Sequence, residues 1–380
     1  MIKSVKEYLK QKTENLSFIE LKEDSFIDIN GYRLDKNIPL PIVIDELLSE
    51  IKTGRAEDEL QVKSFIEGII YTLGVDADFK FFNEYKKILY SYDEKIESYI
   101  LYKGIKYSQN NNFDEAMIYF SCLVNIDLDN TIGLYNYALV LEEKARKCFK
   151  NKDIQRGNIF LKESTRHYEL IIDIDPAFPT AYYRLGYHYK HYKQFRKARI
   201  MWEKLIEIDN NEDIIEDVNQ QLLAIKDDVT YEEGYSDILK GRFKEGLKKL
   251  LSLEEKYTDW WNLLFMIGVG YRQMGEFVEA RKRFEKVLVI YPNQVDSLNE
   301  LGLCFVQLGN FDKAIDKFNT AISLNPNNHE ILCNRGMAYL HNGYIDRAAE
   351  DIHKAYKIDS DDEIIRACMD QLKYIQKSMK

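Results

Sequence analysis

The sequence is poor in the residues that interrupt helices, with only 6 prolines and 18 glycines among 380 residues. An all-β protein needs many more turn residues, so the composition argues against one. The chain also has no excess of basic residues, because 53 Lys and Arg stand against 63 Asp and Glu and give a net charge of −10. An acidic chain lacks the overall attraction for phosphate groups, so we expect no nucleic-acid partner. With 45% hydrophobic residues the chain is too apolar to be disordered.

Cysteine motifs, signal sequences and membrane spans are missing as well. The five cysteines contain no CxxC pair, which argues against a disulfide framework and favours reduced thiols in a cytoplasmic protein. The residues from Met1 to Tyr8 contain no apolar h-region of a secretory signal. The longest apolar stretch, around residues 65–75, is too short to span a bilayer, so we expect no membrane insertion. The cysteines are Cys122, Cys148, Cys304, Cys333 and Cys368.

Catalytic and metal-binding motifs are also absent. The six histidines lack a metal-ligand spacing with a carboxylate, and His188 and His191 lie in a segment rich in Tyr and Lys. No phosphate-binding loop, nucleophile motif or dinucleotide fingerprint occurs. We therefore expect no enzymatic activity, no cofactor and no metal site, and we assign the histidines to surface or packing roles.

A repeat with a period of 34 residues dominates the C-terminal third of the chain. Three columns consist of small residues in consecutive repeats. They are Gly268, Gly302 and Gly336; Gly275, Gly309 and Gly343; and Ala280, Ala314 and Ala348. Large apolar residues keep the same spacing, among them Leu264, Leu298, Leu332, Phe284, Phe318 and Ile352. A fixed period of this length indicates a stack of identical structural units.

Each unit is predicted to be a pair of antiparallel helices. A glycine such as Gly302 lets the two helices approach closely, because a Cβ there would push them apart. A glycine such as Gly309 falls where the first helix ends, the usual place for a left-handed residue. Pro292 and Pro326 then end the second helix of their units.

This pattern resembles the tetratricopeptide repeat family in its period, its small and aromatic columns and its terminal proline. The same register extends backward through units that begin near residues 97, 179 and 227, so the resemblance covers about residues 97–362. It implies an all-α protein, a right-handed superhelix of helical hairpins. Two blocks of repeats are expected, with a short N-terminal β-hairpin as an additional element.

The unit that begins near Thr131 departs from the standard length. Its start keeps Tyr137 and Ala138 and its end keeps Tyr168 and Pro176, but the two halves lie 14 residues further apart than in the other units. Seven extra residues in each helix correspond to about two turns, which preserves the side that each helix presents. We therefore predict a lengthened helical hairpin around residues 144–162 that stands proud of the solenoid.

An internal duplication suggests where the array is divided. Residues 213–226 do not fit the repeat, yet shifted by 150 positions they align with the C-terminal segment, for example Val218 with Cys368 and Leu222 with Leu372. An amphipathic C-terminal segment at 363–378 is a natural cap for the last repeat, so its twin is predicted to be an internal cap. The resulting blocks are residues 97–226 and 227–380, with a change of superhelix direction between them.

The first 96 residues are predicted to form an N-terminal cap region. Residues 42–51, 61–73 and 79–90 have the apolar spacing of helices and could supply one degenerate repeat plus a helix. Residues 26–34 contain Asn30-Gly31 between apolar runs, the signature of a β-hairpin. Residues 37–41 contain two prolines and predict an extended linker.

The first helices of the units supply the candidate binding residues. In the family they line a concave groove that binds extended or helical peptides, and Tyr and Arg dominate binding hot spots. Asn can pair with both groups of a peptide unit. Projection of the groove gives Tyr135, Asn136, Tyr183, Arg184, Tyr187, Tyr231, Tyr235, Phe265, Arg272, Asn299 and Asn334. Packing between units is the alternative role for each tyrosine.

We expect a cytoplasmic adaptor or scaffold that binds a protein or peptide segment in this groove. A clamp for a terminal carboxylate is not expected, because apolar residues or tyrosines such as Val269, Leu303 and Met337 occupy the position of the family's clamping Asn. Two alternatives remain open at this point. One is a regulator that changes shape on binding a signalling peptide, and the other is a structural protein that forms homo-oligomers through its N-terminal region.

Overall fold

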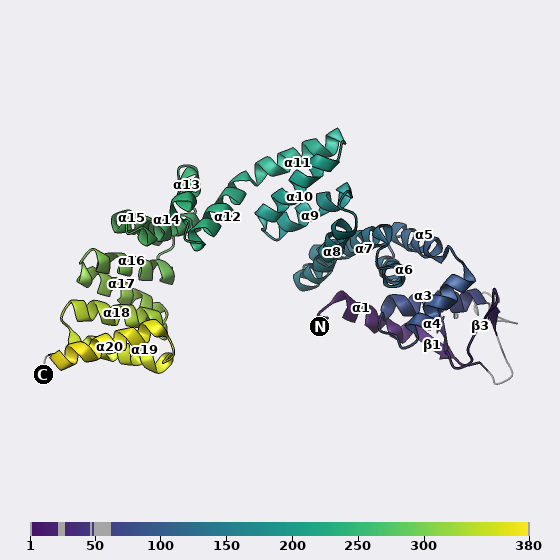
Figure 1. The fold of residues 1–380 in the computed structure, drawn as a ribbon, viewed down its shortest axis with the longest axis horizontal. Helices are drawn as coiled ribbons and strands as arrows, with labels where there is room; N and C mark the ends of the chain where they lie inside the picture. The colour runs from purple at the N-terminus through teal and green to yellow at the C-terminus, as the bar shows by residue number, and fades with distance from the viewer. Residues whose placement is uncertain (1, 22–26, 46–47, 49–61, 379–380) are drawn as a thin grey trace. The chain divides into compact units, whose positions relative to one another are not determined.

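The computed structural model describes residues 2–21, 27–45, 48 and 62–378. Helices make up most of these residues (Figure 1), and the chain separates into two compact units, residues 1–220 and 221–380, called unit 1 and unit 2. The predicted all-α solenoid of helical hairpins is confirmed. The assignment of repeat blocks to residues 97–226 and 227–380 stays a prediction.

Unit 2 contains four helical hairpins of nearly equal length followed by a single helix. Each hairpin has a first helix of 13–14 residues and a second of 12–14 residues. The second helices α15 and α17 end two residues before Pro292 and Pro326. The helices are α12 (Lys226–Leu239), α13 (Phe243–Glu254), α14 (Trp261–Gln273), α15 (Phe277–Ile290), α16 (Val295–Gln307), α17 (Phe311–Leu324), α18 (His329–His341), α19 (Ile345–Ile358) and α20 (Glu363–Ser378).

Both glycine columns have the roles that the sequence predicts. A Cβ added to Gly302 would lie 2.5 Å from the Phe318 ring, so the glycine is needed where α16 crosses α17. Gly309 has a φ of +72° and open space around it, so its backbone conformation, not packing, requires glycine. The large residues of the repeat are buried together in one core that runs through the last hairpins and includes the alanine column.

Unit 1 continues the same architecture with one enlarged hairpin. The long hairpin of α7 and α8 has helices of 20 and 21 residues, as the 14-residue excess in the sequence predicts. Lys152, with a φ of +60°, closes it in the same left-handed conformation that Gly309 has in unit 2. The helices are α5 (Ile96–Gln109), α6 (Phe113–Ile126), α7 (Thr131–Lys150), α8 (Ile154–Ile174), α9 (Pro179–His191), α10 (Phe195–Ile208) and α11 (Glu212–Ala224).

The N-terminal region contains short strands and helices that pack on the first hairpin of unit 1. The predicted β-hairpin is confirmed, since β2 (Asp28–Ile29) pairs with β3 (Tyr32–Arg33) across Asn30 and Gly31, both at positive φ. Helices α3 (Val62–Val75) and α4 (Phe82–Tyr92) confirm two of the three expected helical segments. Before them come α1 (Val5–Lys10), the 3-10 helix η1 (Gln11–Asn15), β1 (Leu16–Ile19) and, after β3, β4 (Leu40–Val43).

Two expectations for this region are wrong. Residues 40–43 are not the end of a linker and the start of a helix, because β4 is a buried strand that pairs antiparallel with β1. Gly68 on α3 allows this strand to approach, since a Cβ there would lie 2.0 Å from the Pro41 carbonyl oxygen. Half of the predicted helix at 42–51, namely residues 46, 47 and 49–51, lies outside the described residues. Helix α1 of this region packs against α8 of the long hairpin, and the expectation that this hairpin stands proud of the solenoid stays a prediction.

The C-terminal helix α20 covers the last hairpin. Ile365 and Leu372 are buried against it, and α20 contacts both α18 and α19. This packing brings two of the scattered cysteines together, with the Sγ atoms of Cys333 and Cys368 2.7 Å apart. Helix α11 occupies most of the predicted internal cap at 213–226, and Val218, the counterpart of Cys368, is buried as well.

Candidate functional site

The first helices of consecutive hairpins in unit 2 lie next to one another. Helix α14 contacts α12 and α16, and α18 contacts α16 and α20. Their shared surface, called the first-helix surface, is bridged by polar side chains. Asn334 on α18 donates a hydrogen bond to Asn299 on α16, with 3.0 Å between Nδ2 and Oδ1. The two asparagines therefore lie on adjacent helices of one surface.

The aromatic candidates of unit 2 differ in their accessibility. The Tyr231 ring lies 4.6 Å from the Trp260 ring, and burial raises the pKa of Tyr231 to about 12. Phe265 packs edge-to-face against Phe284 at 5.7 Å. Tyr235, in contrast, leaves 40% of its surface exposed. Tyr235 is thus the most exposed of the three, whereas Tyr231 contacts the next hairpin and Phe265 packs inside its own hairpin.

Arg272 is ion-paired on this surface. Its guanidinium contacts the Glu300 carboxylate of the next first helix, and both side chains are largely buried. Burial raises the pKa of Glu300, and the Arg272 charge only partly offsets this effect. A partner that forms an ion pair with Arg272 or Glu300 must also offer a charged or polar group to the other residue, because an unpaired buried charge is costly.

In unit 1 the candidate Tyr135 packs between hairpins, and the candidate Asn136 forms a hydrogen bond within its own helix. The Tyr135 ring is 5.5 Å from Phe178 and 6.1 Å from Tyr168, so it packs between α7 and the following hairpin. The Asn136 amide donates to the Ile132 carbonyl oxygen of its own helix at 2.8 Å. Neither contact excludes a partner, but each gives the residue a structural role.

Tyr183 and Tyr187 share one acceptor. Both hydroxyls donate to Oδ2 of Asp217 on α11, at 3.0 and 2.5 Å. Burial and the Asp217 hydrogen bond raise the pKa of Tyr187, so this phenol stays protonated. Asp217 was not predicted as a partner, since it falls in a segment outside the repeat and no periodic signal marks it.

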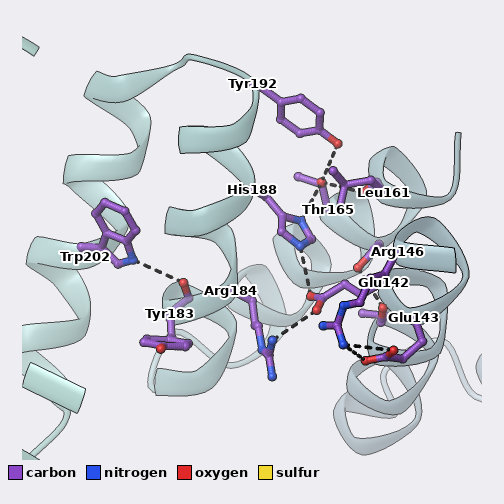
Figure 2. A network of polar contacts seen from close by, with 12 residues as sticks. Glu142, Glu143, Arg146, Leu161, Thr165, Tyr183, Arg184, His188, Tyr192 and Trp202 are labelled. Carbon is purple, nitrogen blue, oxygen red and sulfur yellow. Dashed lines mark hydrogen bonds and ion pairs between the residues drawn. The ribbon is translucent and has the colours of Figure 1, made fainter. Parts of the chain in front are cut away.

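Arg184 belongs to a network of polar contacts that joins α9 to α7 and α8 (Figure 2). Glu142 on α7 accepts from Arg184 at 3.2 Å and contacts Nε2 of His188 at 3.0 Å. Thr165 on α8 lies 2.9 Å from Nδ1 of His188 and 3.3 Å from the Tyr192 hydroxyl. Burial alone would raise the pKa of Glu142, but the hydrogen bond from His188 and the charges of His188 and Arg184 hold it below its usual value.

A second buried imidazole lies on the long hairpin. Nδ1 of His167 donates to the Glu163 carbonyl oxygen at 2.8 Å, and burial lowers the pKa of His167 to about 4. The ring is therefore neutral at pH 7. Among the described residues there is no group of three or more His, Cys, Asp or Glu side chains that could hold a metal ion. Within the residues that the structure describes, no helix is long and apolar enough to cross a membrane.

Hairpins stacked through close glycine contacts and closed by left-handed residues define an α-solenoid built from sequence repeats. Models of the tetratricopeptide repeat match three stretches, residues 263–293, 302–343 and 329–362. The chain therefore contains tetratricopeptide repeats. All three matches lie in unit 2. A comparison with curated proteins finds no match.

Solved structures of repeat proteins resemble the chain at low identity. YrrB, described as a TPR protein with an unusual peptide-binding site, is 15% identical over 66% of this chain and 97% of its own, with a TM-score of 0.28. The Cut9–Hcn1 structure of the APC/C is 15% identical over 86% and 65%, with a TM-score of 0.41. The Sgt2 TPR domain from Aspergillus fumigatus is 16% identical over 31% and 80%, with a TM-score of 0.30. The family assignment rests on the repeat models and not on these similarities.

Proposed function

We propose that this protein is a cytoplasmic, non-enzymatic adaptor that binds a polypeptide segment of another protein on the first-helix surface of unit 2. One observation carries the proposal. Each first helix contributes one partly exposed apolar or tyrosine side chain at intervals of 34 residues, and these side chains are Tyr235, Val269, Leu303 and Met337. A row of this kind on adjacent helices suits the apolar side of a peptide.

The polar residues beside this row support sequence-tolerant binding. Asn299 and Asn334 are half-buried, and Asn334 donates one hydrogen bond to the side-chain oxygen of Asn299. The NH2 group of Asn299 and the side-chain oxygen of Asn334 can then pair with a peptide backbone. Arg272 and Glu300 satisfy each other, so they fix the shape of the surface. The surface thus offers apolar contacts and amide hydrogen bonds, without a free charge for a terminal carboxylate in the row.

We assign the tyrosines of unit 1 a smaller share in partner binding. Tyr183 and Tyr187 are already bonded to Asp217, and Arg184 is bonded to Glu142. A peptide that used these residues would have to break hydrogen bonds between α9 and its neighbours, whereas Tyr235 is accessible as it stands. Tyr135 and Asn136 remain candidates at the edge of the same surface.

A variant pair tests the proposal. Partners are captured from a lysate by the wild type, by Tyr235→Ser and by Tyr356→Ser, and are quantified by mass spectrometry. Tyr356 is a matched control, since it is also an exposed tyrosine but lies on the second helix α19. We expect Tyr235→Ser to lose at least one partner that Tyr356→Ser retains, with direct binding of the purified partner reduced about tenfold. Equal capture by all three proteins would refute the proposal.

A further inference from the structure

The N-terminal helix α1 lies in a cleft that the sequence repeat does not predict. The side chains of Val5 and Leu9 are 2% and 3% exposed, and Ile2 just before the helix is buried too. Helix α1 packs against α3 and α8. Helix α8 is a second helix of its hairpin, so this cleft lies on different helices from the first-helix surface. The cleft, called the α8 cleft, is bounded by α3, α6, α7 and α8.

Tyr8 anchors α1 to the long hairpin. Its hydroxyl donates to Oδ1 of Asp114 at 2.8 Å, and Nζ of Lys144 lies 2.7 Å from the same oxygen. The Tyr8 ring packs edge-to-face on Phe160 at 5.3 Å. Lys144 and Phe160 both belong to the stretch that lengthens the hairpin, residues 144–162. The inserted turns therefore supply part of the contacts that hold the helix.

Charge complementarity orients the same helix. Lys6 pairs with Asp78 at 2.6 Å, Lys10 with Asp76 at 3.2 Å, and Lys12 with Asp114 at 3.4 Å. These pairs are partly or fully exposed, so they contribute little binding free energy but select a basic helix over an acidic one. The cleft thus recognises apolar residues on one side of a helix and lysines on its flanks.

Helix α1 leaves two cavities open beside it. One of about 460 Å³ has walls that include Val124, Leu134, Leu170 and Ile174. The other, of about 430 Å³, is lined by residues that include Tyr189, Tyr192 and Lys197. Both cavities border Val5 of α1 and Glu163 of α8. A longer helix than α1 would bury more apolar surface in the same cleft.

We propose that the α8 cleft is a second protein-binding site, which takes a lysine-bearing amphipathic helix of a partner, and that α1 is a built-in occupant which such a helix displaces. The pattern Val5, Tyr8 and Leu9 with flanking lysines defines the partner: apolar residues at i and i+4, an aromatic residue at i+3 and basic residues around them. Exchange is feasible because a six-residue helix has no stability of its own in water and is held only by docking. This site does not depend on the function proposed for unit 2.

The test uses the full-length protein and a fluorescent peptide with the sequence of residues 2–15. In the wild type the tethered α1 competes at an effective concentration on the order of millimolar, so micromolar peptide should not bind. Leu9→Asp places a charge in the buried contact and releases α1. We expect the peptide to bind this variant at least about tenfold more tightly than it binds the wild type. Gln11→Asp adds the same charge at an exposed position and should behave as the wild type does.

Two further arms locate the peptide in the cleft. In the first arm the peptide carries Tyr8→Ala, and it should bind the Leu9→Asp protein about tenfold more weakly than the unchanged peptide does. In the second arm the protein carries Asp114→Asn as well as Leu9→Asp, and it should bind the unchanged peptide about tenfold more weakly than the Leu9→Asp protein does. If circular dichroism shows that Leu9→Asp is misfolded, the milder variant Leu9→Ala weakens the same buried contact and releases α1 instead.

Three outcomes would overturn the proposal. The first is equal peptide binding by the wild type and the folded release variant, and the second is no binding by either. The third is a concentration-dependent dimer of the wild type that Leu9→Asp abolishes, which would make α1 of a second copy the occupant rather than a partner's helix.

Discussion

The turns inside the hairpins differ between the two units. In unit 2 the left-handed residue that closes each hairpin is a glycine, with φ between +72° and +81° at Gly241, Gly275, Gly309 and Gly343. In unit 1 the same position holds Asn111, Lys152 and Lys193, with φ between +56° and +60°. The backbone therefore makes the same turn with and without glycine.

The close-approach glycines, in contrast, recur in both units. A Cβ at Gly186 would lie 2.0 Å from the Trp202 ring, and one at Gly302 would lie 2.5 Å from Phe318. The fold thus requires the small residue at the crossing more strictly than the glycine in the turn. The repeat models match only residues 263–293 and 302–362, although unit 1 has the same hairpins.

The largest expected effect is at the shared crossing. Gly302→Leu should lower the free energy of unfolding of unit 2 by about 3 kcal/mol, because the new side chain overlaps Phe318 in a packed core. Asn310→Leu, in the nearby turn, is exposed and should change it by no more than about 0.5 kcal/mol. Thermal and urea unfolding measure both. Equal midpoints would mean that the crossing is not tightly packed.

The next largest effect should be a pH dependence of stability that is present in unit 1 because of His167. His167 has a folded pKa of about 4, below the roughly 6.5 of an unfolded histidine, so the unfolded state binds a proton more readily. Unit 1 should therefore lose stability as pH falls from 6.5 toward 4, by about 2 kcal/mol at pH 5.

Urea unfolding at pH 7 and pH 5 checks this effect. His167→Gln should remove that part of the loss, whereas His353→Gln, an exposed position in unit 2, should leave it unchanged. An identical pH dependence in wild type and His167→Gln would contradict the assignment.

Exchange of the turn residues should have a smaller and opposite effect in the two units. Gly309→Lys should destabilise unit 2 by about 1 kcal/mol, because a side chain disfavours the left-handed conformation. Lys193→Gly should stabilise unit 1 by about 0.5–1 kcal/mol for the same reason. Chemical unfolding of both variants checks the pair. A loss of stability in Lys193→Gly would show that the lysine side chain contributes more than its backbone strain costs.

The smallest expected effect concerns the asparagine pair of unit 2. Asn299→Ala alone leaves Asn334 without its acceptor and should lower the free energy of unfolding of unit 2 by about 0.5–1 kcal/mol. The double variant Asn299→Ala/Asn334→Ala should lower this free energy by no more than about 0.5 kcal/mol, while its binding of a partner peptide should weaken by about tenfold. A double-mutant cycle by urea unfolding, beside a calorimetric titration, measures both. Unchanged binding would place the partner elsewhere on the surface.

The repeat geometry was predictable because it depends on local periodicity. Glycine and large apolar residues 34 positions apart predicted the hairpins of unit 2, and the 14-residue excess predicted the long helices of α7 and α8. The pairing of β1 with β4 was not predictable in this way. It joins segments separated by other strands, and the two prolines of residues 39–41 masked β4.

Polar contacts between elements were also beyond the sequence pattern. Tyr183 and Tyr187 were correctly placed on a first helix, but their acceptor Asp217 lies 30–34 residues away in a segment outside the repeat. Asn299 and Asn334 were expected on neighbouring helices, yet their mutual hydrogen bond depends on side-chain rotamers. Periodicity identifies the face of a helix, and it does not identify the partner of a polar group.

The long hairpin limits how this protein can have changed over time. Lys152 falls seven residues beyond the turn position of the other hairpins, so both helices are longer by the same two turns and keep their facing. A single seven-residue insertion in one helix would have left the two helices unequal. The same added turns carry Lys144 and Phe160, on which Tyr8 rests. Descendants of this protein that lose the insertion should therefore lose the N-terminal helix as well, so that the two distant segments are inherited together.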